Sequence, residues 1–194
     1  MPPVPEFGTA ALGDQDAADG LVETAIEDPR WDGLDLTALA DRAARATFAH
    51  LDMPTDGFTL CLMGCDDARI AVLNAEFRGK PTPTNVLSWP SEDLADDADG
   101  APPARPLPWD GDDPWSLGDI ALAYDTCARE AAEAGLVMAD HVTHLVVHGL
   151  LHLLGYDHQR DADATLMEGL ETEILGKMGL ADPYRDAQHT ADGA

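Results

Sequence analysis

Histidine is concentrated in one short segment of this chain. Five of the seven histidines lie in HVTHLVVHGLLHLLGYDH, which runs from His141 to His158. His148 and His152 are four residues apart, so on a helix both imidazoles lie on one face, one turn from each other. Imidazole nitrogens at this spacing are typical ligands of a transition-metal ion. The segment therefore predicts a metal site on a helix.

A third ligand is expected directly after that helix. Gly155 favours the left-handed conformation that ends a helix, and the chain reversal brings His158 towards the same ion. The pattern H-x-x-x-H-x-x-G-x-x-H has the ligand spacing of the metzincin zinc proteases. Three neutral nitrogen ligands suit Zn²⁺ and leave a fourth position for water, as in catalytic sites. His144 is an alternative ligand, or a group that supports a ligand or faces the substrate.

The residue after the first ligand argues against a peptidase. Zinc peptidases carry Glu at that position as the general base on water, whereas this chain has Gly149. A glycine inside a helix costs about 1 kcal/mol relative to alanine, so another group is expected to approach the backbone closely there.

A second set of candidate residues lies in FRGKPTPTNVLSWP. Arg78 and Lys80 flank Gly79 on a loop that enters a short strand. Arginine is a planar, bidentate phosphate donor, and glycine lets the backbone approach a ligand. Taken alone, such a loop is more often a solvated turn. Beside a metal it is a candidate phosphate clamp.

The elements that must position these residues alternate between strands and helices. We expect strands at 21–27, 57–64, 84–89 and 118–123, and helices at about 35–49, 66–77, 125–135, 139–154 and 161–178. Their spacing is not a regular βαβ series. The predicted fold class is α+β: a single domain with one small mixed sheet, packed helices, and the zinc site on a helix and its following turn. The carboxylates of the last helix, Glu168, Glu171 and Glu173, are interpreted as a solvated face.

The charge is strongly negative and unevenly distributed. There are 37 Asp and Glu against 11 Lys and Arg, a net charge of −26. We expect a domain at 21–180, flexible tails at 1–20 and 181–194, and a mobile acidic Pro/Asp-rich insertion at 91–114. The total charge argues against a nucleic-acid partner. However, residues 36–90 carry 6 acids and 5 bases, so this segment is compatible with local phosphate binding.

Other features of the sequence limit the class of protein to which this chain can belong. No stretch approaches the roughly 20 apolar residues of a membrane span, and the first residues lack the basic start and apolar run of a secretory signal. Three cysteines are too few, and odd in number, for a disulfide framework. We therefore expect a cytoplasmic protein that does not contact a membrane.

Three segments in order, LNAEFRGKPTPTNVLSWP, LGDIALA and HVTHLVVHGLLHLLGYDH, closely resemble the YbeY family of rRNA-maturation endoribonucleases. The resemblance covers about Leu21 to Leu180. It implies an α+β fold, one zinc ion held by His148, His152 and His158, and a functional arginine at Arg78. Pro81 and Trp89 depart from residues that are common in the family, both at loop or strand-end positions.

The resemblance also implies an activity. It predicts a metal-dependent, single-strand-specific endoribonuclease that processes ribosomal RNA, notably near the 3′ end of the small-subunit rRNA, and acts in ribosome quality control. Arg78 and Lys80 would bind substrate phosphates, and the small ribosomal subunit or an associated protein is the expected partner. No general base is apparent, so attack by water and by a 2′-hydroxyl both stay open. The rivals are a non-catalytic zinc-containing ribosome-assembly factor and, third, a metzincin-like peptidase.

Overall fold

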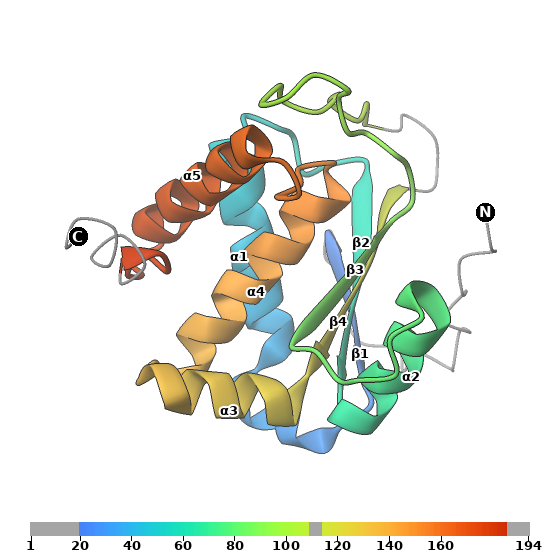
Figure 1. The fold of residues 1–194 in the computed structure, drawn as a ribbon, viewed down its shortest axis with the longest axis vertical. Helices are drawn as coiled ribbons and strands as arrows, with labels where there is room; N and C mark the ends of the chain where they lie inside the picture. The colour runs from blue at the N-terminus through green and yellow to red at the C-terminus, as the bar shows by residue number, and fades with distance from the viewer. Residues whose placement is uncertain (1–19, 109–113, 186–194) are drawn as a thin grey trace.

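A four-stranded mixed sheet forms the centre of the molecule, in the order β1-β2-β4-β3 (Figure 1). The computed structural model describes residues 20–108 and 114–185. The strands are β1 (Val22–Ile26), β2 (Phe58–Cys65), β3 (Val86–Pro90) and β4 (Trp115–Ala123). Strands β1, β2 and β4 are parallel, and β3 pairs antiparallel with β4 at one edge. The α+β class predicted from the sequence is confirmed.

Helices cover both faces of the sheet unequally. They are the 3-10 helix η1 (Pro29–Leu34) and the α-helices α1 (Leu36–His50), α2 (Asp67–Arg78), α3 (Tyr124–Ala134), α4 (Met138–Leu153) and α5 (Asp161–Lys177). Helices α1 and α4 lie on one face with α5 outside them, and α2 lies alone on the other face (Figure 1).

The alternation of side chains along β4 explains these two layers. Ile120 and Leu122 belong to the large core that also contains buried residues of α1, α4 and α5. The intervening Ala121 and Ala123 point the other way and belong to a smaller core with Ile70 of α2. Because successive side chains of a strand face opposite sides, one apolar strand supports both layers.

Helix α4 packs closely on the sheet at Gly149. A Cβ atom built there would lie 3.1 Å from Cδ1 of Ile120. The close approach expected from a glycine inside this helix is therefore confirmed, and the approaching group is a side chain of β4. The helix ends as predicted, since Gly155 follows its C-terminus with φ of 89°.

The loop between α2 and β3 is tied back to its helix. Arg78 is the last residue of α2, and Gly79 caps it with φ of 68°. The side chain of Asn74 donates a hydrogen bond to the carbonyl oxygen of Thr82 at 2.8 Å. This bond fixes the course of the loop that carries Lys80. Pro90 ends an edge strand, the position in a sheet where proline is tolerated.

The part of the acidic insertion that the structure describes, 91–108, is not loosely attached. Arg160 donates hydrogen bonds to the carbonyl oxygens of Asp97 (2.8 Å) and Asp96 (2.9 Å) and pairs with the carboxylate of Asp99 (2.9 Å). The amide of Gly100 donates to Asp163 at 2.7 Å. These contacts fasten the segment to the start of α5, and the mobility expected from its composition stays a prediction.

The remaining differences from the sequence predictions are local. Strand β4 begins at Trp115, earlier than expected, and η1 was not predicted. Tyr184 lies in the predicted C-terminal tail, yet it is partly buried and hydrogen-bonded to α5. The predicted N-terminal tail up to residue 19, residues 109–113 and the C-terminal tail from 186 lie outside the described residues.

Within the described ranges, no single helix is long and apolar enough to cross a membrane. Helices α3 and α4 meet the length and composition criteria only when taken together across a bend of 116°.

Candidate metal centre

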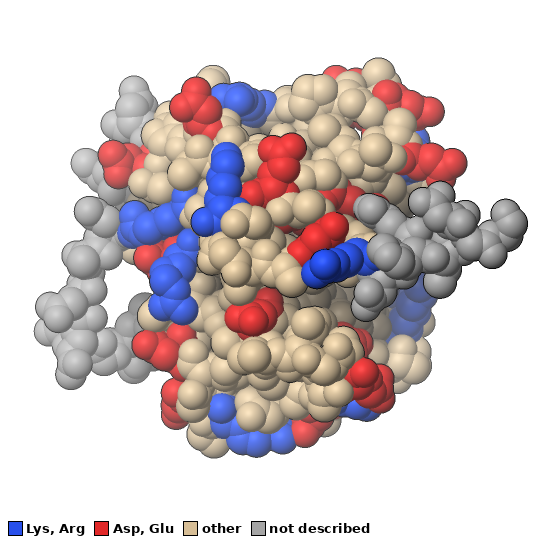
Figure 2. Space-filling view, turned by 90° about the vertical axis from the view of Figure 1, so that its left-hand side faces the viewer, with Lys and Arg blue, Asp and Glu red and all other residues tan. Residues whose placement is uncertain are grey.

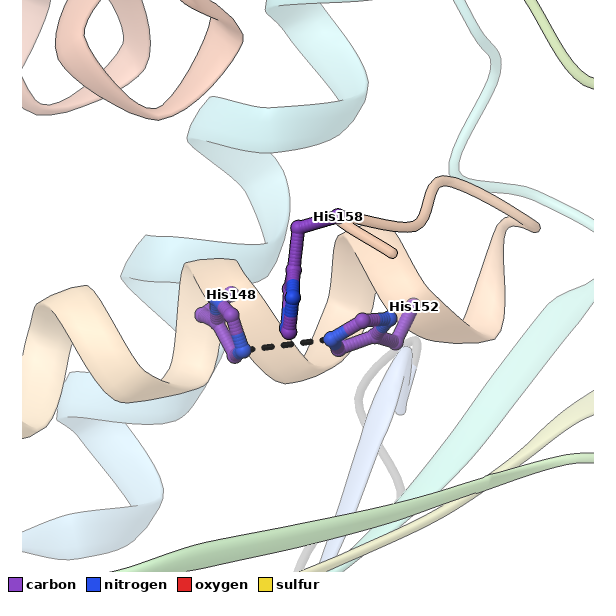
Figure 3. Close-up of side chains that lie close together, drawn as sticks. All are labelled: His148, His152 and His158. Carbon is purple, nitrogen blue, oxygen red and sulfur yellow. Dashed lines mark hydrogen bonds between the residues drawn. The ribbon is translucent and has the colours of Figure 1, made fainter. Parts of the chain in front are cut away.

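Three histidines converge at the C-terminal end of α4 (Figure 3). His148 and His152 project from one face of the helix, and His158 reaches the same place from the turn that follows. The Nε2 atoms of His148 and His152 are 3.1 Å apart. One ring nitrogen from each of the three lies within 4.8 Å of the others. The structure thus brings together the three residues that the sequence spacing selects.

This donor set fits a zinc ion. At Zn–N distances of about 2.0–2.1 Å, two nitrogens of a tetrahedral site lie about 3.3 Å apart, close to the separation of the His148 and His152 Nε2 atoms. Burial and the neighbouring imidazoles of His148 and His158 lower the pKa of His152 to about 4. His152 is therefore neutral at physiological pH, which is the state that binds a metal.

The Nδ1 atoms of both helical histidines have partners on the side away from the cluster. Nδ1 of His152 lies 2.9 Å from the carbonyl oxygen of Tyr156. Nδ1 of His148 lies 2.7 Å from Oε1 of Glu171. Both partners accept hydrogen bonds, so each ring carries its proton on Nδ1 and presents the lone pair of Nε2 to the other ligands.

Glu171 was interpreted from the sequence as part of a solvated helix face, and this interpretation is wrong. Its side chain is completely buried on α5, facing α4. Burial raises its pKa, but the nearby imidazole of His144 and the hydrogen bonds with His148 and Tyr184 outweigh that effect and lower the pKa to about 2. Glu171 is therefore an ionised carboxylate inside the protein. The signal that could have identified it is its place in the apolar stripe of α5, with Met167 and Ile174.

His144 lies beside Glu171 rather than beside His152 and His158. Its Nε2 atom is 3.5 Å from Oε2 of Glu171. With His148 and Glu171 it forms a second group of potential metal ligands, which shares only His148 with the three-histidine cluster. Of the roles considered for His144, its position favours support of a ligand.

Arg78 shares a pocket with two of the three histidines. A pocket of about 550 Å³ is lined by Arg78, His152 and His158, together with residues of β3 and of the segment 92–95. Arg78 is exposed and forms no ion pair within the described residues. Its guanidinium is therefore available to an anion in the pocket. Lys80 is exposed on the same loop but does not line this pocket.

Three carboxylates also line this pocket. Glu92 and Asp93 of the insertion line it, as does Asp157. Asp157 accepts a hydrogen bond from the backbone amide of His158 at 2.7 Å. A Cβ atom on Gly155 would lie 2.8 Å from Leu94, so the insertion packs directly on the turn that carries His158.

Comparison with known proteins places the chain in a family. The profile described as "Endoribonuclease YbeY" matches residues 23–179. A protein of Dinoroseobacter shibae named "Endoribonuclease YbeY" is 59% identical over 178 residues, 91% of this chain and 97% of its own length. One of Cereibacter sphaeroides with the same name is 63% identical over 164 residues, 84% of this chain and 98% of its own length. The chain belongs to the YbeY family.

A solved structure supports the fold independently. The solution structure of a protein from Thermotoga maritima matches with a TM-score of 0.50 and 19% identity, covering 81% of this chain and 91% of that one. At this identity the match concerns the fold alone.

Proposed function

We propose that this chain cleaves single-stranded ribosomal RNA with a zinc ion held by His148, His152 and His158 and with Arg78 as the phosphate-binding residue. Its enzyme class follows from its family: it is a metal-dependent endoribonuclease. Beyond this class, we propose that the enzyme processes the small-subunit rRNA near its 3′ end and acts in ribosome quality control. We also propose that it is cytoplasmic.

One observation carries the proposal: Arg78 lines the same pocket as His152 and His158. When bound, zinc acts as a Lewis acid that makes hydroxide available near neutral pH and offsets charge on a phosphoryl oxygen. Arg78 binds the scissile or adjacent phosphate with two parallel hydrogen bonds and stabilises the charge that develops there. Lys80, on the loop beyond the pocket, contacts a flanking phosphate.

The geometry disfavours the peptidase alternative. A peptidase of this motif needs a carboxylate at position 149 that faces the metal. The Cβ direction of Gly149 leads instead to Ile120 of the sheet. Any side chain at this position would press on Ile120, and Gly149 itself supplies no carboxylate.

The net charge of −26 supports a role for a partner in substrate delivery. On the face drawn in Figure 2, Asp and Glu side chains are spread widely, and several Lys and Arg side chains gather at the left of the view without extending across the face. An acidic surface repels RNA and leaves binding to local contacts. A partner on the small ribosomal subunit is therefore part of the proposal.

Substrate class is tested with purified protein and three substrates: a single-stranded rRNA fragment, the same fragment annealed to its complement, and casein. The wild type is compared with His148→Ala and with the control His141→Ala, a histidine of the same helix outside the cluster. We expect cleavage of the single strand alone, lost in His148→Ala and kept in the control. Absence of cleavage by a zinc-loaded wild type would favour the non-catalytic assembly factor.

A further inference from the structure

A buried carboxylate links the last helix to the candidate metal centre. Glu171 has no exposed side-chain surface, and its two oxygens face different groups. Oε1 lies 2.7 Å from Nδ1 of His148. Oε2 accepts a hydrogen bond from the hydroxyl of Tyr184 and lies 3.5 Å from Nε2 of His144. A buried charge is retained only when such partners compensate for its lost hydration.

The bond to His148 determines which of its nitrogens can bind a metal. The 2.7 Å hydrogen bond between Nδ1 of His148 and Oε1 of Glu171 occupies Nδ1, so only Nε2 of this ring is open to a metal. Nε2 then holds the lone pair, and this atom lies 3.1 Å from Nε2 of His152. The negative charge of Glu171 also raises the electron density on the imidazole of His148, so its Nε2 lone pair binds a cation more strongly.

The other helical ligand is held differently. Nδ1 of His152 is bonded to the carbonyl oxygen of Tyr156, a backbone group. The orientation of His152 is thus built into the turn after α4. The orientation of His148 depends on a side chain that comes from another helix and can be replaced by mutation.

An alternative role for the same group is a second cation site made by His144, His148 and Glu171. The distances favour a direct hydrogen bond. Two ligand atoms on one zinc ion lie about 3.3 Å apart, whereas Nδ1 of His148 and Oε1 of Glu171 are separated by 2.7 Å. That separation is typical of a charge-assisted hydrogen bond.

We infer that Glu171 is a positioning residue of the metal centre, which holds His148 with Nε2 directed at the ion, and that Tyr184 holds Glu171 in turn. The inference rests on the proposed three-histidine zinc site. It assigns a metal-binding role to the last helix and to residue 184, both outside the histidine motif.

Zinc affinity of the whole chain, measured by competition with a chromogenic chelator, tests this role. Glu171→Gln keeps the size of the side chain and removes its charge. We expect its dissociation constant for Zn²⁺ to rise about 10- to 100-fold, and that of Tyr184→Phe to rise less. The control is Glu173→Gln, the same change at an exposed position of the same helix, which should bind as the wild type does. Thermal melts of the metal-free variants establish that each is folded.

A second measurement uses the unmodified protein, in case Glu171→Gln does not fold. The ¹⁵N shifts of the His148 ring in the zinc-loaded wild type should show a proton on Nδ1 and zinc on Nε2. Zinc on Nδ1 would overturn the inference, as would unchanged affinity in a folded Glu171→Gln. Two zinc equivalents in the wild type and one in Glu171→Gln would make Glu171 a ligand instead. If the wild type binds no zinc, the proposed three-histidine site itself is wrong. That result differs from unchanged affinity in Glu171→Gln, which contradicts only the role of Glu171.

Discussion

Arg78 and His152 line one pocket although their helices pack on opposite faces of the sheet. Arg78 ends α2, and His152 lies in the last turn of α4. The edge strand β3 lies between the two helices, and Ser88 and Pro90 of this strand also line the pocket. A residue at the end of each helix can therefore reach around the edge of the sheet to the same anion.

Removal of the metal should destabilise the protein. A ligand at 100 times its dissociation constant stabilises the folded state by about 2.7 kcal/mol, which for a domain of this size corresponds to about 5–10 °C in melting temperature. Differential scanning calorimetry before and after chelation, and after zinc is restored, measures this shift. The shift should be absent in His152→Ala. An equal shift in that variant would show that the chelator acts elsewhere.

The histidine cluster is the part of the site that sequence reasoning predicts best. A single helix and one glycine-containing turn determine the spacing of His148, His152 and His158. The periodicity of a helix and the way a helix ends are therefore enough to predict that these residues converge. The shared pocket with Arg78 depends on how α2 and α4 meet at the sheet edge, which local rules do not describe. Sequence reasoning therefore proposed Arg78 from the composition of its loop and from the family resemblance, and the structure adds that Arg78 lines a pocket with His152 and His158.

Glu171 illustrates a different limit. Glu168, Glu171 and Glu173 are close together on α5, and charged residues on a helix are usually solvated. Burial of one of them is possible only because His148 and Tyr184, from α4 and from the segment after α5, supply hydrogen bonds. Such compensation is a tertiary feature. Composition also cannot reveal the contacts of 91–108, because Arg160, which binds this segment, lies more than fifty residues further along the chain.

Arg160→Ala should release the acidic wall of the pocket. The substitution removes the hydrogen bonds to Asp96 and Asp97 and the ion pair with Asp99. Hydrogen exchange monitored by mass spectrometry should accelerate in peptides covering 92–104 and stay unchanged in β2 and β4. Arg69→Ala, which removes an arginine that pairs with Glu27 far from the insertion, is the control. Unchanged exchange at 92–104 would mean that the wall is held by other contacts.

Asp119 provides a pH-dependent test of the fold away from the histidines. It faces the side of the sheet opposite Ile120, and burial raises its pKa to about 6. The folded state therefore binds more protons than the unfolded state between about pH 4 and 6, so this group's contribution to stability falls as pH rises through that window.

Replacing Asp119 with Asn should accordingly stabilise the protein at pH 8 by about 1 kcal/mol, a value reduced by partial exposure to water. The gain should vanish near pH 4. Urea unfolding of both proteins across this range measures it, with Glu133→Gln at an exposed position of α3 as the control for net charge. A gain that does not depend on pH would point to packing as its cause.

RNA binding should depend weakly on salt. Arg78 and Lys80 offer two phosphate contacts, and each contributes about −0.7 to the slope of log K against log salt for a single strand. Fluorescence anisotropy with a labelled rRNA fragment should give a slope of about −1.4, reduced by about 0.7 in Arg78→Ala. A much steeper slope would show that further basic residues bind the strand.

The most direct test of the account measures cleavage and zinc content in the same samples. A labelled single-stranded rRNA fragment is cut under single-turnover conditions at saturating zinc, with wild type, Arg78→Ala, His152→Ala and the control Arg69→Ala. We predict that Arg78→Ala keeps its zinc and loses cleavage, that His152→Ala loses both, and that the control keeps both. Cleavage at the wild-type rate by zinc-loaded Arg78→Ala, or by zinc-free His152→Ala, would contradict the account.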